Sequence, residues 1–471
     1  MDIGKTKRVV LLSEYLGIDK SELESMGVFN SIVNLDSEFY INILRLKNTT
    51  VEEFKNSYNR INSYFKDIIT LLDNSEKRGD VFYRNARQKF DFRGIKEINL
   101  GLSATGVDSG FRGKLADQVV MDAFDIVKKG VKRPEIFHLV GLFEKGVGAD
   151  RISDMIGYLI YDDIREYTKN INNKLQITKE LHPKLIIKEG IVFNEYKNCE
   201  LLYLPIDILH EIPIARSWEE IGNVISKNKT IRDEMSEQVL KEWEKYTVDE
   251  KKLYIKEMLL NPEKCNTIID SYLNTKIDPL SIYENVDYCY HCVINNVIDA
   301  VHSFKFEKQI KTSKDVSMYV LKCFKDFIEN KKGWLILQEV GSKNREIIAQ
   351  ELLHAVGDEL LSILNYDPSF EANEGRGPVD LKISRGNDKT IIEIKLSSNS
   401  SYLHGYTTQI EEYAKAENAN NKIFVFIIME EGDYDKVEKL NAARNEIVQS
   451  GKTPAEVFVV NAIRKASASK Y

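Results

Sequence analysis

Several features are scarce in this chain, and each scarcity excludes a class of protein. Only five cysteines occur in 471 residues, which excludes a disulfide framework and agrees with a reducing compartment. No run of about 18 apolar residues, the length that spans a bilayer, occurs in the sequence. The N-terminal residues also lack the apolar core and cleavage site of a signal peptide. We therefore expect a cytoplasmic protein that has no membrane partner.

Linker and low-complexity sequence are scarce as well. Proline contributes nine residues, and no tract rich in proline, glycine or serine separates one part of the chain from another. With 43% hydrophobic and 30% charged residues, a chain of 471 residues can form two or three domains with cores of their own. We expect these domains to pack against one another.

A surplus of positive charge is also missing. The chain has a net charge of -7, and residues 335–471 hold 16 Lys/Arg against 21 Asp/Glu, a difference of -5. This balance argues against tight nonspecific binding of nucleic acid by the C-terminal part alone. Phosphate contacts would then need bound metal ions, a second subunit or a local cluster of cations. The one basic patch consists of Lys128, Lys129, Lys132 and Arg133, and a solvated helix end is its simpler interpretation.

One cysteine pair, Cys289 and Cys292, has the spacing of metal ligands. The second half of a zinc motif is missing, and only Cys265, His302 and Cys323 are near enough in sequence to complete it. Residues 289–304 are apolar at helical spacing, which favours buried structural thiols on a helix. We do not expect zinc.

Two glycine-bearing segments of the N-terminal part have structural interpretations. Gly101 and Gly106 have the spacing of a phosphate-binding loop, but neither the Lys-Ser/Thr pair nor a preceding apolar strand is present. Further along, Asp150 has the position of a helix N-cap before a helical run over residues 155–167, and Asp154 suits the first turn. The functional alternative is a carboxylate site built from Asp150, Asp154, Asp162 and Asp163.

The strongest chemical pattern lies between residues 378 and 396. Residues 379–384 and 390–396 are rich in β-branched and aliphatic side chains, and the segment between them, Arg-Gly-Asn-Asp-Lys, has the composition of a tight turn. We predict a β-hairpin. Because side chains alternate along a strand, Glu393 and Lys395 share one face, while Ile392 and Ile394 point into the core.

If Asp380 faces this pair across the hairpin, two carboxylates and an ammonium converge. Oxygen ligands are those that Mg²⁺ prefers, so Asp380, Glu393 and the main-chain carbonyl of Ile394 would hold a metal ion. The ion would polarise a phosphoryl oxygen and lower the pKa of a bound water. Lys395 would orient that water or offset charge on the phosphate. Since Glu-x-Lys is common by chance, a solvated surface hairpin is the alternative.

The order of the surrounding elements favours the site. Residues 344–364 have the apolar spacing of a helix, residues 407–417 form a second one, and residues 422–429 are an apolar strand. A helix over residues 433–450 and a strand over residues 456–460 follow. The predicted order is helix, hairpin, helix, strand, helix, strand. With Pro-Val-Asp at 378–380 and Glu-Ile-Lys at 393–395, this arrangement resembles the PD-(D/E)xK, or restriction-endonuclease-like, nuclease superfamily.

A second motif extends the resemblance. Gln409 and Tyr413 match the Gln-x-x-x-Tyr helix of RecB-type nuclease modules and of CRISPR-adaptation nucleases, and they lie four residues apart on one helix face. In that family such residues lie beside the metal centre and contact substrate or the lysine. The adaptation nucleases also carry iron-sulfur cysteines around this core. Because no cysteine follows Cys323 here, we expect no iron-sulfur cluster.

Four further acidic or polar residues are candidates for supporting roles. Segment 371–380 is similar to a Glu-x-Asn-x-Gly-Arg-Gly-Pro-Val-Asp form of bacterial restriction-like proteins, in which Glu371 would end the strand before the hairpin. Glu346 and Gln350 lie one helical turn apart, where such enzymes often place an accessory acidic group. Glu351 competes for that role, because it interrupts the apolar stripe of the same helix.

The sequence thus predicts a multidomain α+β protein. We expect a mostly helical N-terminal domain over residues 1–195, a helical middle region over 196–334 that bridges, oligomerises or recognises a target, and a PD-(D/E)xK domain over 335–471. The last has a mixed central sheet flanked by helices. The resemblance covers only this C-terminal third.

The resemblance implies an Mg²⁺-dependent deoxyribonuclease, with Mn²⁺ as a substitute, that acts in bacterial restriction or anti-phage defence. It implies DNA as a partner. Because the C-terminal part is acidic although its site is complete, we also expect further copies of the chain in a dimer or higher oligomer, and a protein that regulates activity. Two alternatives stay open. One is a nuclease fold that binds DNA or a partner without chemistry, and the other is a nuclease of repair or DNA junctions.

Overall fold

The computed structural model describes residues 8–101, 110–144, 146–210, 247–274, 277, 279–282, 285–303, 310–364, 367–372 and 379–465. For residues 248, 249, 362–364, 367–372 and 379 it describes the backbone only. The chain divides into two compact units: a helical unit, Val10–Leu280, and a sheet unit, Met1–Val9 with Ser281–Tyr471. This division lies inside the predicted middle region 196–334, which therefore contributes to both units and does not form a third.

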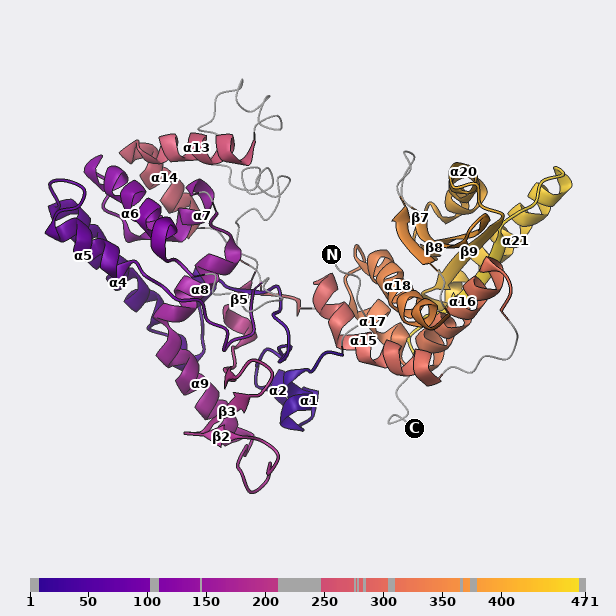
Figure 1. Ribbon diagram of the computed structural model, residues 1–471, viewed down its shortest axis with the longest axis horizontal. Coiled ribbons are helices and arrows are strands. Elements are labelled where there is room, and N and C mark those ends of the chain that lie inside the picture. Colours follow the sequence, from indigo (N-terminus) through magenta and orange to yellow (C-terminus); the bar gives the residue numbers. More distant parts are fainter. Residues whose placement is uncertain are drawn as a thin grey trace. The chain divides into compact units, whose positions relative to one another are not determined.

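The helical unit is built from short and medium helices with a few small strands (Figure 1). Its helices are α1 Leu12–Leu16, α2 Lys20–Ser25, α3 Ile43–Lys47, α4 Ser57–Asn74, α5 Val81–Lys89, α6 Gly113–Lys128, α7 Val140–Phe143, α8 Ala149–Leu159, α9 Tyr161–Lys174, α13 Val248–Leu259 and α14 Pro262–Leu273, with 3-10 turns η1 Glu52–Phe54, η2 Pro134–Leu139 and η3 Ile206–Ile208. The paired strands are β1 Tyr40–Ile41 with β5 Leu209–His210, and β2 Ile187–Lys188, β3 Ile191–Asn194 and β4 Cys199–Glu200 in antiparallel order.

Helix α4 shows how the apolar periodicity of the sequence becomes packing. Ile61, Phe65, Ile68 and Leu72 recur at helical spacing, and all four are buried. Helix α4 begins at Ser57, after the separate 3-10 turn Glu52–Phe54. The apolar face of α4 contacts α5 and α6.

The segment around Asp150 differs from its prediction. Helix α8 begins at Ala149 after Gly148, so Asp150 lies in the first turn and is not the N-cap. The predicted continuous run also divides at Ile160 into α8 and α9. Two of the four carboxylates considered as one site have separate contacts: Asp154 accepts a hydrogen bond from the amide of Ile95, and Asp163 pairs with Arg60 and Ser57. This favours the structural interpretation of these residues.

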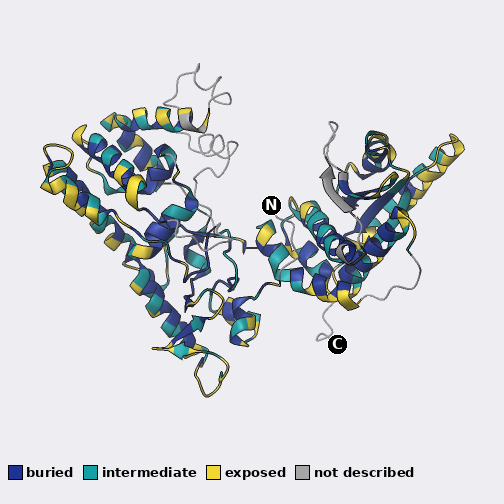
Figure 2. Cartoon of the chain, in the orientation of Figure 1, coloured by how far each residue is buried: buried dark blue, intermediate teal, exposed yellow. Residues whose placement is uncertain are grey.

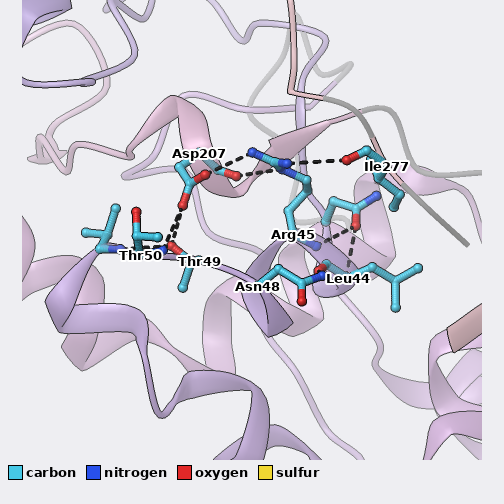
Figure 3. Close-up of polar contacts among 9 residues, drawn as sticks. Leu44, Arg45, Asn48, Thr49, Thr50, Asp207 and Ile277 are labelled. Atoms are coloured by element: carbon cyan, nitrogen blue, oxygen red, sulfur yellow. Dashed lines mark hydrogen bonds and ion pairs between the residues drawn. The ribbon is translucent and has the colours of Figure 1, made fainter. Parts of the chain in front are cut away.

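A half-buried ion pair joins distant segments of the helical unit (Figure 3). Arg45 of α3 donates to the Asp207 carboxylate at 2.9 Å and to the Asp207 carbonyl at 2.8 Å. The Thr49 hydroxyl donates to the other carboxylate oxygen of Asp207 at 2.5 Å. Arg45 also donates to the carbonyl of Ile277 at 3.4 Å. These contacts link residues near position 45 with segments more than 150 positions away.

The sheet unit contains a five-stranded mixed sheet in the order β10-β9-β8-β7-β6. Its strands are β6 Asp367–Ala372, β7 Val379–Arg385, β8 Asp388–Leu396, β9 Asn421–Ile428 and β10 Glu456–Asn461. Strands β6, β7 and β8 pair antiparallel, whereas β9 and β10 continue parallel to β8. The helices are α15 Val286–Ser303, α16 Ser313–Asn330, α17 Gly333–Glu339, α18 Arg345–Leu364, α19 Tyr402–His404, α20 Ile410–Ala416 and α21 Tyr434–Gln449, with π-helix η6 Gly405–Gln409 and 3-10 turn η7 Glu431–Asp433.

Helices cover both faces of this sheet (Figures 1 and 2). On one face, α16 contacts β7, β8 and β10, and Ser313 at its first turn donates to Asp388 of the hairpin. On the other face, Ile391 packs with Tyr406, Ile410, Phe424 and Leu440 from η6, α20, β9 and α21 in one apolar cluster. Both faces of β8 and β9 are therefore buried, as expected for strands inside a sheet with helices on two sides.

These elements confirm the predicted α+β class and the mixed C-terminal sheet. Cys289 and Cys292 lie on α15, as the apolar spacing indicated, with Cys289 buried. Among the helices within the described residues, none is both long and apolar enough to cross a membrane.

Candidate active site

The β7-β8 hairpin brings the three predicted site residues together. Its pairing runs from Arg385↔Asp388 to Leu381↔Ile392. Gly386 has a positive φ of 63°, which a two-residue turn requires and which glycine adopts without strain. One step beyond the last pair, Asp380 lies opposite Glu393, on the face that Lys395 shares.

The two strands part at this point, and the side chain of Asp380 replaces a backbone acceptor. Its Oδ2 accepts a hydrogen bond from the amide of Ile394 at 2.6 Å. Since the N–H and the C=O of one strand residue point to the same edge, the carbonyl of Ile394 is also directed to this edge. The arrangement agrees with the predicted role of that carbonyl, which stays a prediction.

Lys395 is held between two carboxylates. Its ammonium lies 2.8 Å from Glu346 Oε1 and 3.1 Å from Glu393 Oε1. Burial lowers the pKa of Lys395, but the attraction of Glu393 and the hydrogen bond to Glu346 outweigh it, and the pKa stays above its usual value. Lys395 is therefore a fixed cation, and its first task is to offset negative charge.

When both are ionised, Asp380 and Glu393 carry more negative charge than the surroundings offset, so their pKa values are raised. Burial raises the pKa of Asp380 to about 6, against the hydrogen bond from Ile394 and the charge of Lys395. Burial and then the charge of Asp380 raise the pKa of Glu393 to about 8. Glu393 is 3% exposed, and its Oε2 has no hydrogen-bond partner within the described part of the chain.

The donor set fits a divalent cation. With Asp380, Glu393 and Glu346 ionised and Lys395 protonated, three negative charges meet one positive charge and leave a net charge of -2. An Mg²⁺ ion would cancel this surplus and give the orphaned oxygen of Glu393 a ligand role. Over the described ranges, no group of three or more His, Cys, Asp or Glu side chains has metal-binding geometry. The fit of Mg²⁺ to the site therefore depends on the carboxylates of Asp380 and Glu393 and on the main-chain carbonyl of Ile394.

Helix α18 supplies the supporting contacts through a polar stripe. Glu346 binds Lys395, and Gln350 donates to Asp380 Oδ1 at 2.7 Å. His354, which the sequence analysis missed, contacts the carbonyl of Asp380 through Nε2 at 2.6 Å. The spacing of four residues on an otherwise apolar helix is the signal that would have found it. The competing Glu351 lies on a turn of α18 that packs near α15: burial and then the charge of Glu351 raise the pKa of Tyr290 on that helix.

The segment after β8 closes the site from the other side. A Cβ on Gly405 would lie 3.3 Å from Lys395 Cε and 3.4 Å from Gln409 Oε1, so both side chains pass close to this glycine. Tyr413 is half-buried, and its pKa is raised first by burial and then by the charge of Glu393. The predicted helix over residues 407–417 begins as π-helix η6, which ends at Gln409, and continues as α20, which contains Tyr413. Single-turn π-helices are frequent at functional sites.

Glu371 was predicted as a supporting residue, and Asn399 was not. Glu371 lies in β6, which ends one residue later at Ala372, but its side chain lies outside the described residues. Asn399, which the sequence analysis did not single out, donates from Nδ2 to Glu346 Oε2 at 2.8 Å. Its segment is a Ser/Asn turn with no pattern that would have indicated this contact.

The chain matches two family models, each described as a domain of unknown function. DUF8370 matches residues 17–214 and DUF8371 matches residues 313–431. The second range contains every candidate site residue from Glu346 to Tyr413. No curated protein and no solved structure matches the chain.

Proposed function

We propose that the sheet unit is a metal-dependent nuclease that hydrolyses phosphodiester bonds of DNA, with a restriction-endonuclease-like fold. The observation that carries the proposal is the buried pair Asp380 and Glu393: an oxygen of Glu393 has no partner within the described residues, and the raised pKa values indicate that both carboxylates ionise readily only with a further cation beside them. Buried groups with strongly perturbed pKa values concentrate at functional sites. We further propose that it serves restriction or anti-phage defence.

Each residue of the site has a task in this reaction. Asp380, Glu393 and the carbonyl of Ile394 would hold Mg²⁺ or Mn²⁺, which when bound polarises a phosphoryl oxygen and lowers the pKa of water. The ammonium of Lys395 has three N–H donors. Two are directed at Glu346 and Glu393, and the third is available to another partner. That proton serves to orient the attacking water or to stabilise charge on the phosphate. Gln350 and His354 fix the side chain and carbonyl of Asp380.

The test is cleavage of supercoiled plasmid DNA with Mg²⁺ or Mn²⁺ by the full chain and by Lys395→Ala. We expect metal-dependent cleavage by the wild type and a loss of at least about a thousandfold in Lys395→Ala, because electrostatic stabilisation of the transition state is lost. Lys422→Ala is the matched control. Lys422 lies on the neighbouring strand β9, pairs with Glu411 at 2.6 Å and has a side-chain exposure of 14% against 11% for Lys395.

Three outcomes are decisive. Loss in Lys395→Ala with cleavage retained in Lys422→Ala supports the assignment. Cleavage that is unchanged in Lys395→Ala contradicts it. If the wild type binds linear, single-stranded and branched DNA but cleaves none of them with either metal, the chain is a binding protein with a nuclease-like site.

A further inference from the structure

The turn that follows β8 holds one side chain in a fixed orientation. Asn399 donates its backbone amide to the carbonyl of Leu396 at 3.0 Å, and its Oδ1 accepts the amide of Ser401 at 2.8 Å. An amide oxygen that accepts from a backbone N–H leaves the NH₂ group pointing the other way. That group donates to Glu346 Oε2 at 2.8 Å. The turn therefore defines where Asn399 presents its donor.

Glu346 depends on this donor for its own orientation. One carboxylate oxygen accepts from Asn399 and the other from Lys395, at 2.8 Å each. The side chain of Glu346 is 26% exposed and comes from the first turn of α18, so little packing restricts it. A long side chain in such a position has rotamer freedom that costs up to about 2 kcal/mol to remove. Two hydrogen bonds, each with a charged partner, provide that restriction.

Lys395 in turn depends on Glu346. Its ammonium is directed by Glu346 and Glu393, and the remaining N–H is the one available to a water or a phosphate. If Glu346 rotates away, the ammonium has only Glu393 as a partner and follows it. A change of about 1 Å in the position of a reacting group can lower the rate by about a hundredfold.

We propose that Asn399 is a positioning residue, which holds Glu346 so that Glu346 can aim the ammonium of Lys395 at the scissile phosphate. The chain of contacts runs from the Ser/Asn turn through α18 to β8, across 53 positions between Asn399 and Glu346. The proposal rests on the nuclease function proposed above. It assigns to the turn after β8 a role in catalysis that Asn399 performs without touching substrate.

Cleavage kinetics of Asn399 variants provide the first test. We expect Asn399→Ala to lower the cleavage rate by about tenfold to a hundredfold, the usual effect of losing a supporting hydrogen bond beside a catalytic group. Asn399→Asp keeps the shape but places a carboxylate against Glu346, so its rate should be lower still. In the Glu346→Ala background the Asn399→Ala change should have no further effect, because Asn399 acts through Glu346.

Asn420→Ala is the matched control. Asn420 also accepts a backbone amide with its Oδ1, that of Lys389 at 3.3 Å, but it lies at the opposite end of β8. We expect its cleavage rate to equal that of the wild type. Equal rates for Asn399→Asp and wild type, or additive losses in the double variant, would overturn the proposal.

The second test measures the position of Lys395 without cleavage. Metal-free wild type and variants are labelled briefly with an amine-reactive reagent, and modification of Lys395 is quantified by peptide mass spectrometry. Lys395 is 9% exposed and held by two carboxylates, so release of Glu346 should increase its labelling in Asn399→Ala and not in Asn420→Ala. Unchanged labelling in Asn399→Ala contradicts the proposal. An increase supports the contact even if the wild type cleaves no DNA, which would contradict only the nuclease function.

Discussion

Buried carboxylates of the helical unit and those of the candidate site in the sheet unit are partnered in different ways. In the helical unit, Asp122 pairs with Lys256, Asp163 with Arg60, and the half-buried Asp207 with Arg45 and Thr49 (Figure 3). Each of these three carboxylates has a cation of its own. In the sheet unit, Asp380, Glu393 and Glu346 share the single ammonium of Lys395.

The difference separates charges that hold a fold from charges that serve a reaction. A buried ion pair with satisfied partners is a local structural contact, and breaking it is costly. A buried carboxylate pair with one shared cation costs stability in the absence of a ligand, and such a cost is retained where function requires it. Four predictions test this contrast.

The largest effect is expected from breaking a pair of the helical unit. Lys256→Met leaves the carboxylate of Asp122, whose side chain is 1% exposed, without its cation. The unfolding free energy of this unit should fall by roughly 3–5 kcal/mol, measured by urea unfolding. Lys132→Met is the control, because Lys132 and Asp73 are 61% and 37% exposed and an exposed pair contributes at most about 1 kcal/mol. Equal losses in both variants would contradict the structural role of Asp122.

At the candidate site, removal of a carboxylate charge is expected to raise the unfolding free energy. Glu393 has a folded pKa of about 8 against an ordinary value of 4.5, so the stability present below pH 4.5 is lost as the pH rises through 8. In chelator at pH 8, Glu393→Gln should raise the unfolding free energy of the sheet unit by roughly 1–3 kcal/mol and abolish cleavage.

Glu417→Gln is the matched control for this rise in unfolding free energy. Glu417 lies in the same unit and pairs with Lys382 at 2.5 Å, with side-chain exposures of 1% and 12%. The same substitution should therefore destabilise at position 417. A destabilised Glu393→Gln at pH 8 would show that Glu393 is an ordinary structural carboxylate.

Acid should lower the unfolding free energy of the helical unit through protonation of His138. Burial lowers the pKa of His138 to about 3 from 6.5, so its neutral form contributes stability above pH 6.5 that is lost as the pH falls toward 3. Between pH 7 and pH 5 the loss from this group should be roughly 2 kcal/mol. His138→Phe, which can pack against Phe65 and Tyr272, should remove this part of the pH dependence. Identical pH profiles of wild type and variant would refute the assignment to His138.

The smallest effect is expected at Gly405. A Cβ there would lie 3.3 Å from both Cγ and Cε of Lys395, so Gly405→Ala should displace the lysine stem by a few tenths of an ångström. We expect a several-fold drop in cleavage rate with an unchanged melting temperature. Gly432→Ala, where a Cβ would meet no atom within 4 Å, should leave both quantities unchanged. A fall in melting temperature without a change in rate would place Gly405 in packing alone.

Much of the sheet unit could be predicted from local patterns. The period of two along β8 placed Glu393 and Lys395 on one face. The predicted turn over residues 385–389 left the register open; the structure has a two-residue turn between Arg385 and Asp388, which sets Asp380 opposite Glu393. The polar residues Glu346 and Gln350, one turn apart, indicated the side of α18 that faces the site. These features are set by residues close in sequence.

The features that were missed depend on contacts between distant residues. Asn399 reaches Glu346 across 53 positions, and η6 is a π-helix where Gly405 passes over Lys395. The division of the chain at Leu280 and Ser281 likewise reflects packing that no composition change marks. At Asp150, capping chemistry suggested an N-cap, but the N-cap is Gly148, two residues earlier.

The central claim is that surplus negative charge at Asp380 and Glu393 holds a divalent cation for phosphodiester hydrolysis. It is tested most directly by titration calorimetry of Mn²⁺ into the wild type and into Glu393→Gln, with Glu417→Gln as a second carboxylate variant. The account predicts binding in the wild type and Glu417→Gln that is lost in Glu393→Gln. Equal binding by all three chains, or no binding by the wild type, would contradict it.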